Sequence, residues 1–422
     1  MNGNRFPIQK GVACPLKWGW HTLRLSESRS CCCHRVDAVP ITVENFDNFH
    51  NAPVWVEHRK LQLDGKFPQQ GCQYCEHIEK QGGTSDRLLH MTDPALSLGP
   101  PELLTDPEAV HVTPRVLEVF LNNTCNLACI YCNQANSSRI MRENQKFGHI
   151  IPGEIINAKP MISVVPTTTD YPLLVDKFFQ YLNKNYSHLR SLNILGGEPF
   201  YQKEFPDILD FIIKNKNQDL TFTVVSNLMV SSDAIESFVS KMKYALVNRR
   251  LKRIDITASI DCFGPESEYV RDGLKLDVWT KNFEYLLGQK WLYVSINNTI
   301  TNLTIKTLPE LLKYVNELRK VRHIHHAFGL VDGKAHLHPK IFGPGFFESD
   351  FEKILALMPK ETTQDYQSYD YMVGLIKSVN ADPADYSLQH NLKCYLNELD
   401  RRRNRNWRLI FPWLVEVLDN VV

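Results

Sequence analysis

Short apolar runs alternate with helical patterns between Arg115 and Val331, and this alternation constrains the fold more than any other feature of the chain. Each apolar run is long enough for one strand, and the six runs are Val116–Leu121, Ser191–Leu195, Thr221–Val225, Arg253–Ile260, Tyr293–Ile300 and Ile324–Val331. Between them, apolar residues recur at helical spacing in Tyr171–Tyr181, Phe205–Lys214, Ser232–Val247, Val278–Leu287 and Leu308–Leu318. Strands that alternate with helices pair in parallel through right-handed crossovers. Six such units predict an α/β fold, a partial (β/α)6 barrel, with reactive groups at the carboxyl ends of its strands.

The sequence divides into three parts around this region. Residues 1–110 contain six cysteines and few long periodic segments, so we expect a small cysteine-rich domain and a linker. Residues 111–331 form the predicted barrel core, interrupted at 134–170 by a segment with scattered Gly and Pro that is a candidate lid. Residues 332–422 are mostly helical and polar in pattern, which predicts a helical C-terminal region.

Composition excludes several classes of protein. Lys and Arg number 48 and Asp and Glu 47, so the net charge gives no reason to expect a nucleic-acid or membrane-surface partner. We find no apolar run of 18 residues or more and no signal-peptide pattern at the N-terminus. These features predict a cytoplasmic protein without a membrane partner.

The chain has eleven cysteines, and nine of them fall in two clusters. In a reducing compartment, clustered cysteines indicate metal binding or catalysis more often than disulfides. Cys262 and Cys394 stand alone and are expected to be small buried hydrophobic residues. The clusters therefore carry the functional signal.

The second cluster consists of Cys125, Cys129 and Cys132, directly after the first predicted strand. A 4Fe–4S cluster usually has four cysteine ligands, so a loop with three would leave one iron open to a ligand that is not protein. Structural zinc is the alternative, but it requires four ligands. The nearest histidine is His111, on the far side of the preceding strand. The spacing therefore favours an iron–sulfur cluster over zinc.

A Gly-Gly-Glu-Pro turn, Gly196 to Pro199, follows the next predicted strand. Two glycines after a strand allow the backbone to approach a ligand closely. Glu198 offers a carboxylate to an ammonium or hydroxyl group, and Pro199 fixes the turn. Alone, the motif is more often a simple tight turn than a binding site.

The cysteine loop and the Gly-Gly-Glu-Pro turn, in this order and context, resemble the radical S-adenosylmethionine enzymes over about residues 113–331. The resemblance implies that three cysteines hold a 4Fe–4S cluster and that S-adenosylmethionine chelates its fourth iron. It also implies an external one-electron donor, such as a flavodoxin or a ferredoxin. Reductive cleavage would then give methionine and a 5′-deoxyadenosyl radical, which abstracts a hydrogen atom from an unidentified substrate, a peptide or a small molecule.

The resemblance also implies roles for further residues. Gly196, Gly197 and Glu198, with Pro199 in the same motif, would contact the amino group of S-adenosylmethionine. Ser226 and Asn227 resemble the position on the ribose side, although Leu228 replaces the glycine that usually follows. The remaining candidates, which resemble positions facing the cofactor or substrate, are Ser259, Asp261 and Arg271. Ordinary polar groups at strand ends are the alternative interpretation of these later residues.

The N-terminal cysteines resemble the auxiliary-cluster module called twitch, a short relative of the SPASM domain, placed here before the core. Cys14, Cys72, Cys75 and one residue of the triplet Cys31–Cys33 would hold a second, auxiliary 4Fe–4S cluster. Cys32 is our choice within the triplet, and spacing does not exclude Cys31 or Cys33. The alternative is zinc bound by the same four residues. A fully ligated auxiliary cluster favours electron transfer, and hence a net oxidation or a peptide modification.

Three other functions remain open from the sequence. One is a different reaction on the same fold, such as epimerisation or methylthiolation. The second is a non-catalytic iron–sulfur electron-transfer protein, and the third is a zinc-organised nucleic-acid-binding protein. The basic run Arg401–Arg405 is expected to be a solvated helix end with ion pairs, and a binding patch for an anionic substrate or a nucleic acid is the minority interpretation.

Overall fold

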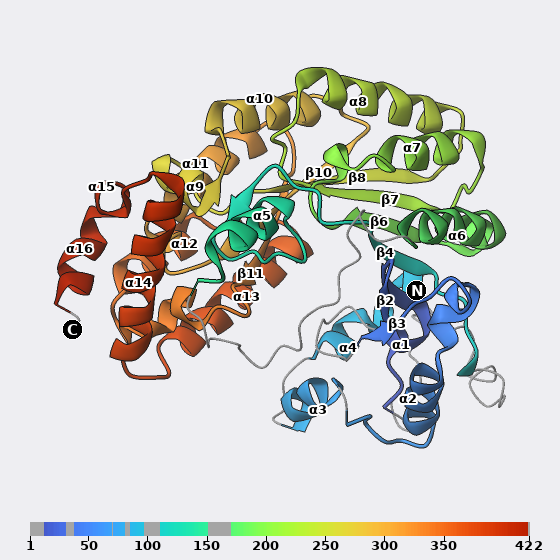
Figure 1. The fold of residues 1–422 in the computed structure, drawn as a ribbon, viewed down its shortest axis with the longest axis horizontal. Coiled ribbons are helices and arrows are strands. Elements are labelled where there is room, and N and C mark those ends of the chain that lie inside the picture. The colour runs from blue at the N-terminus through green and yellow to red at the C-terminus, as the bar shows by residue number, and fades with distance from the viewer. Residues whose placement is uncertain are drawn as a thin grey trace. The chain divides into compact units, whose positions relative to one another are not determined.

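The computed structural model describes residues 12–30, 38–69, 71–80, 85–96, 110–150 and 170–420. The chain divides into two compact units, each made of segments that are distant in the sequence (Figure 1). The first unit comprises residues 1–123, 161–224 and 241–254, and the second comprises residues 124–160, 225–240 and 255–422. The predicted boundaries at residues 110 and 331 do not coincide with this division, and the three predicted domains stay a prediction.

The first unit contains a parallel-rich sheet with the strand order β7-β6-β4-β1-β2-β3. The predicted parallel pairing is confirmed, because β4 pairs in parallel with β6 and β6 with β7. Inward-facing residues alternate with outward-facing ones, and Leu192, Ile194, Phe222 and Val224 are fully buried. The strands are β1 (Trp20–Arg24), β2 (Glu27–Arg29), β3 (Val39–Pro40), β4 (Val116–Phe120), β6 (Ser191–Leu195) and β7 (Thr221–Ser226).

The N-terminal strands are a feature that the sequence did not reveal. β1 runs parallel to β4, with Trp20 opposite Val116 and Arg24 opposite Phe120, and β2 and β3 follow as antiparallel neighbours. Residues before position 110 thus belong to the same sheet as the first core strand. A small apolar core beside β1 includes Leu16, Trp55 and Val116.

Helices surround this sheet within the first unit. Those from the N-terminal region are short, and α6 and α7 match the predicted helical patterns, burying Phe178 and Ile208. The helices are α1 (Pro15–Gly19), α2 (Pro53–Leu63), α3 (Gln73–Lys80), α4 (Asp86–Leu89), α6 (Tyr171–Asn185) and α7 (Phe205–Lys214).

The second unit contains three parallel strands, β8 (Arg253–Ser259), β10 (Tyr293–Ile300) and β11 (His325–Leu330). Two short strands, β5 (Ala128–Cys129) and β9 (Arg271–Asp272), form a separate antiparallel pair. The α/β class and the parallel pairing are therefore confirmed in both units.

Helices of the second unit include the predicted α10 (Leu276–Leu287) and α11 (Leu308–Arg319), and α8 (Ser232–Val247) runs from this unit into the first. The C-terminal region is helical, as predicted. The remaining helices are α5 (Ser138–Phe147), α9 (Pro265–Val270), α12 (Glu348–Leu357), α13 (Thr363–Val379), α14 (Tyr386–Arg403), α15 (Trp407–Ile410) and α16 (Pro412–Asp419).

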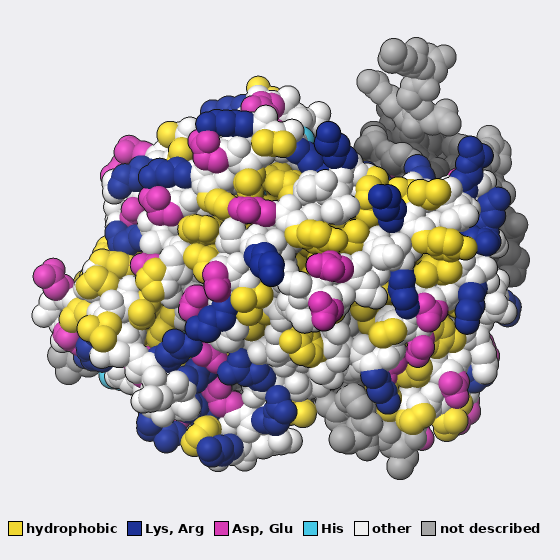
Figure 2. Space-filling model, turned by 90° about the horizontal axis from the view of Figure 1, so that it is seen from above, with side chains coloured by type: hydrophobic (Ala, Val, Ile, Leu, Met, Phe, Trp, Pro, Cys, Tyr) yellow, Lys and Arg dark blue, Asp and Glu magenta, His cyan; other side chains and the backbone are white. Residues whose placement is uncertain are grey.

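Helix α5 occupies part of the segment 134–170 that was predicted as a lid. Residues 151–169 lie outside the described part of the chain, so the lid stays a prediction. Across the described ranges, no helix is both long and apolar enough to cross a membrane. On the face drawn in Figure 2, basic and acidic side chains are interspersed, which agrees with the balanced composition.

Candidate functional site

The cysteine loop lies in the second unit and is fixed by α5. Ser137, the residue before α5, accepts a hydrogen bond from the backbone N–H of Ile140 and donates one of 2.7 Å to the carbonyl of Leu127. Ser138 also bonds the loop, because its hydroxyl accepts from the backbone N–H of Cys125 at 3.2 Å. The helix N-terminus therefore uses its capping side chains to hold the loop.

The loop also forms a strand in the middle. Cys129 lies in β5 and is the partner of Arg271 in β9. A turn follows, in which the N–H of Cys132 donates to the carbonyl of Cys129. Cys125, Cys129 and Cys132 are all partly exposed. A single short loop thus carries three partly exposed cysteines.

Nitrogen donors lie around two of these sulfurs. The backbone N–H of Leu127 is 3.4 Å from Cys125 Sγ, and the amide of Asn227 is 3.9 Å from the same atom. A guanidinium nitrogen of Arg271 is 3.9 Å from Cys129 Sγ. N–H donors of this type stabilise thiolate, the form of cysteine that binds metals.

The donor set fits an iron–sulfur cluster by its chemistry. Three thiols with N–H donors beside them are the ligands and surroundings that such a cluster uses. Within the ranges that the structure describes, no three histidine, cysteine or acidic side chains form a ready-made site for a single metal ion. Burial raises the pKa of the Cys129 thiol to about 12, and the nearby Arg271 opposes this rise.

Asp261 and Arg271, both predicted as site residues, form a buried ion pair beside the loop. Arg271 binds Asp261 through two nitrogens at 2.9 and 2.8 Å, and their exposed fractions are 5% and 1%. Burial alone would lower the pKa of Arg271, but the Asp261 carboxylate outweighs it and raises that pKa well above its usual range. Arg271 is therefore held as a fixed positive charge beside Cys129.

Tyr131 and Thr299 also donate hydrogen bonds to the Asp261 carboxylate. The Tyr131 hydroxyl, which lies within the cysteine loop, donates to Asp261 Oδ2 at 2.7 Å, and the Thr299 N–H donates to Oδ1 at 2.8 Å. Ser259, the last residue of β8, is partly exposed two positions earlier. Tyr131 was not predicted as a site residue from the sequence, although its place between Cys129 and Cys132 indicates that it lies at the site.

Asn227, another predicted residue, connects the end of β7 to the loop. Its amide donates to Asn126 Oδ1 at 2.9 Å as well as approaching Cys125, and its own Oδ1 accepts from Met229 N. Ser226 accepts a hydrogen bond from the N–H of Leu228 at 3.0 Å. Both predicted residues thus hold a turn, and Asn227 lies directly at the cysteine loop.

The backbone conformation of Leu228 explains why the family that the chain resembles usually has a glycine at this position. Its φ is +56°, in the left-handed region that non-glycine residues rarely adopt. The side chain is fully buried. Asn282 holds the turn by donating to the carbonyls of Leu228 and Val230, each at 2.9 Å.

The Gly-Gly-Glu-Pro turn lies in the first unit, directly after β6. Gly196 has a φ of +113°, and a Cβ there would lie 3.0 Å from the carbonyl oxygen of Asn122. Gly197 donates its N–H to the same carbonyl at 3.2 Å. Glu198 is fully buried and accepts from the N–H of Phe200, while Pro199 begins a short 3-10 helix. The turn therefore requires glycine at position 196, and it is anchored to Asn122, three residues before Cys125 in the chain.

Two of the N-terminal cysteines lie close together through Gln62. The Gln62 side chain accepts from the N–H of Cys14 at 3.2 Å and donates to Cys72 Sγ at 3.8 Å. Cys75 follows on α3 and is partly exposed. Cys32, with the rest of its triplet, lies outside the described residues.

Comparison with known proteins gives distant relatives. No family model matches the chain. It is 20% identical over 211 residues to "Probable GTP 3′,8-cyclase" of Methanococcus maripaludis, covering 50% of this chain and 58% of that protein. It is 23% identical over 221 residues to the protein of the same name from Methanocaldococcus jannaschii, with the same coverage. The chain thus spans less than two thirds of the length of these relatives.

Among solved structures, the chain is similar to SuiB of Streptococcus suis. The S-adenosylmethionine complex of SuiB is 18% identical with a TM-score of 0.35, covering 70% of this chain and 58% of that one. A second SuiB structure is 16% identical with a TM-score of 0.36, covering 78% and 63%. Both TM-scores are below 0.5.

The α/β fold, the three-cysteine loop and the glycine-rich turn after β6 define a class of iron–sulfur protein. The curated relatives support the resemblance of this chain to the radical S-adenosylmethionine superfamily.

Proposed function

We propose that this chain is an enzyme that cleaves S-adenosylmethionine reductively and abstracts a hydrogen atom from a substrate. The resemblance to the radical S-adenosylmethionine superfamily supports this function, and the arrangement around the cysteine loop is the observation on which the proposal rests. Three thiols share one loop, and Asn227 and Arg271 approach two of their sulfurs. No ordinary structural role requires this combination.

Cys125, Cys129 and Cys132 would hold the 4Fe–4S cluster. When bound, the cluster and S-adenosylmethionine supply the reducing electron and the 5′-deoxyadenosyl radical. Arg271, fixed by Asp261, keeps a positive charge near Cys129 and offsets part of the negative charge of the thiolates. Asn227 orients the Cys125 side of the loop.

The Gly-Gly-Glu-Pro turn would receive the amino group of S-adenosylmethionine. Glu198 is a buried carboxylate at the carboxyl end of β6, and Gly196 and Gly197 are partly exposed and carry no side chain that would keep a ligand from the backbone. Ser226, Ser259 and the neighbouring strand ends would face the rest of the cofactor or the substrate. An external one-electron donor, a flavodoxin or a ferredoxin, would reduce the cluster.

Cys14, Cys32, Cys72 and Cys75 would hold an auxiliary 4Fe–4S cluster. The link from Cys14 through Gln62 to Cys72 supports a shared site for two of them. Such a cluster would take one electron from the substrate radical after its hydrogen atom is abstracted. The substrate would then lose one hydrogen atom and one electron, a net two-electron oxidation.

The test is anaerobic reconstitution with iron and sulfide, followed by metal counting and an assay for 5′-deoxyadenosine. We expect about eight irons per chain, and a loss of roughly four on Cys72→Ala or on Cys129→Ala. Cys394→Ala is the matched control, because this cysteine lies on α14 outside both clusters and is exposed, contrary to the burial expected from the sequence. A chain that keeps its clusters but forms no 5′-deoxyadenosine under strong reduction would refute the enzymatic function.

The substrate can be sought with the same preparation. Candidate peptides and small molecules carrying deuterium are offered in turn, and transfer of deuterium into 5′-deoxyadenosine identifies the one that is attacked. GTP belongs in this panel because the curated relatives are named for it.

A further inference from the structure

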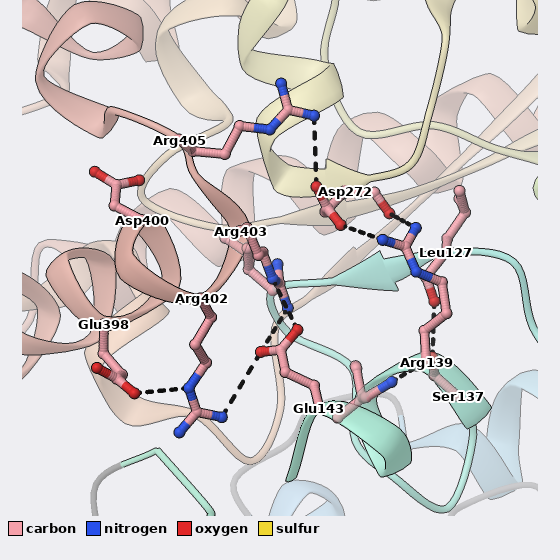
Figure 3. Close-up of polar contacts among 12 residues, drawn as sticks. Leu127, Ser137, Arg139, Glu143, Asp272, Glu398, Asp400, Arg402, Arg403 and Arg405 are labelled. Atoms are coloured by element: carbon pink, nitrogen blue, oxygen red, sulfur yellow. Dashed lines mark hydrogen bonds and ion pairs between the residues drawn. The ribbon is translucent and has the colours of Figure 1, made fainter. Parts of the chain in front are cut away.

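A strongly basic cavity adjoins the cysteine loop in the second unit. It has a volume of about 500 Å³ and lies between α5, β9 and the C-terminal end of α14 (Figure 3). Cavities of this size bind small molecules in other proteins. Six positively charged side chains line it, namely Arg139, Arg142, Lys146, Arg402, Arg403 and Arg405.

The sequence creates this concentration of charge in two ways. Arg139, Arg142 and Lys146 recur at intervals of three and four residues, which places them on one face of α5. Helix α14 ends at Arg403, and the capping residue Asn404 has a φ of +51°, in the left-handed region, which changes the direction of the chain. Residues on both sides of that turn, including Arg405, therefore reach the same cavity.

Acidic side chains neutralise only part of this charge. Glu143 accepts two contacts from Arg403, at 3.1 and 3.4 Å, and Asp272 accepts from Arg139 at 2.8 Å. These are the two carboxylates in the lining, and Glu398 beside the cavity pairs with Arg402, so six cations less three anions leave three positive charges. Figure 3 shows the acidic groups bridging α5, β9 and α14.

Arg402 is independent evidence that the cavity binds an anion. Its side chain is only 2% exposed, and its Nε donates to Glu398 at 2.7 Å. Its Nη1 is buried and has no hydrogen-bond acceptor in the described part of the chain, since Glu143 is 3.7 Å away. A buried donor without an acceptor is costly, and an anion in the cavity would satisfy it.

We propose that this cavity binds the oligophosphate group of a small molecule. Three surplus charges match several phosphate charges better than one carboxylate, and guanidinium groups suit phosphate oxygens because they offer paired donors. The size of the cavity and the burial of Arg402 favour a small ligand over an acidic protein. This inference does not depend on the proposed function.

Binding of an oligophosphate in this cavity would affect the contacts that hold the cysteine loop. Arg139 donates to the carbonyl of Asn126, next to Cys125, at 2.9 Å, and it also bonds Asp272. Asp272 is the neighbour of Arg271, which approaches Cys129. An oligophosphate that draws Arg139 or Arg405 from Asp272 would therefore act on residues that hold the loop.

Titration calorimetry of the full chain with inorganic tripolyphosphate, and separately with GTP, tests the proposal. The double variant Arg142→Gln, Lys146→Gln removes two exposed cations of the cavity, so the fold should persist, and a thermal melt checks this. Lys353→Gln, Lys377→Gln is the matched control, because it removes the same charge from exposed positions on α12 and α13.

We expect the cavity variant to weaken binding of tripolyphosphate by about tenfold or more and the control by less than about twofold. Equal affinity for both probes would assign recognition to the phosphates, and tighter binding of GTP would add a contribution from the nucleoside. Both outcomes support the proposal. It is overturned if neither probe binds the wild-type chain, if both double variants weaken binding equally, or if polyglutamate binds and tripolyphosphate does not, which would indicate a protein partner.

Discussion

Asp261 is the residue on which the contacts beside the cysteine loop converge. Its carboxylate accepts from Arg271, Tyr131 and the backbone of Thr299, and its carbonyl accepts from Asn298 at 2.7 Å. Because the carboxylate is buried, each donor is also deprived of water. Loss of its charge therefore affects the loop, β9 and β10 together.

Asp261→Asn should lower the free energy of unfolding by about 3 kcal/mol, because it leaves the charge of Arg271 buried without its partner. Urea unfolding of the purified chain measures this. Glu310→Gln, which breaks the exposed pair with Lys313, should cost less than about 1 kcal/mol. If both variants lost the same free energy of unfolding, burial of the Asp261–Arg271 pair would not increase its contribution to stability.

At this scale the sequence predicted the residue types better than their contacts. The resemblance pointed to Asp261, Arg271 and Asn227, and all three lie at or beside the cysteine loop in the second unit. It did not point to Tyr131 or Gln62, because their partners are distant in the sequence. The Cys32 assignment still depends on spacing alone.

Among the elements, the turn after β7 is held against its own backbone preference. Leu228 adopts a positive φ that costs on the order of 1 kcal/mol, and Asn282 of α10 holds its carbonyl. The turn carries Asn227 to the cysteine loop. Helix α10 therefore supports the site although it supplies no residue to it.

Asn282→Ala should destabilise the protein by about 2 kcal/mol, because it removes two buried hydrogen bonds at once. The midpoint of urea unfolding reports the change. Gln289→Ala, which removes one exposed hydrogen bond to Tyr285, is the control and should have almost no effect. If Asn282→Ala left the unfolding midpoint unchanged, the turn would be stable without these two hydrogen bonds.

The element boundaries were predictable wherever the apolar pattern was long. The predicted strands Ser191–Leu195 and Tyr293–Ile300 agree with β6 and β10 at both ends, as do two of the helices, α7 and α8. Strands β5 and β9 were missed, because two residues are too few to show a period. Strand β1 is as long as β6 but was missed because its sequence, Trp-His-Thr-Leu-Arg, mixes polar and apolar residues without a clear apolar run. Their pairing also joins residues far apart in the chain.

For the whole molecule, buried neutral histidines set the response to acid. Burial lowers the pKa of His50 to about 4, with Arg59 adding to the effect, and burial lowers that of His326 to about 3. Both values lie below the ordinary value of about 6.5, so the unfolded chain binds more protons below that pH. Stability is therefore complete above pH 6.5 and is lost as the pH falls.

The free energy of unfolding should fall by about 3 kcal/mol or more between pH 6.5 and pH 4. Chemical unfolding at a series of pH values measures the slope. His326→Phe should flatten it, since neither ring nitrogen of His326 has a hydrogen-bond partner in the described structure and the ring already stacks on Phe328. An unchanged slope in that variant would contradict the assignment.

The division into two units was not predictable from local patterns. Residues 1–123 join segments beyond residue 160, and the sequence gives no local sign of such long-range contacts. Local patterns do carry the α/β class and the cysteine loop, which is why those predictions agree with the structure.

The central claim is that the cysteine loop holds a cluster with one iron left for S-adenosylmethionine. The most direct measurement is the electron paramagnetic resonance spectrum of the reduced Cys72→Ala chain, in which only the loop cluster should remain. Addition of S-adenosylmethionine should shift the spectrum, and Cys129→Ala in the same background should abolish it. A spectrum that S-adenosylmethionine leaves unchanged, or one that survives loss of Cys129, would contradict the account.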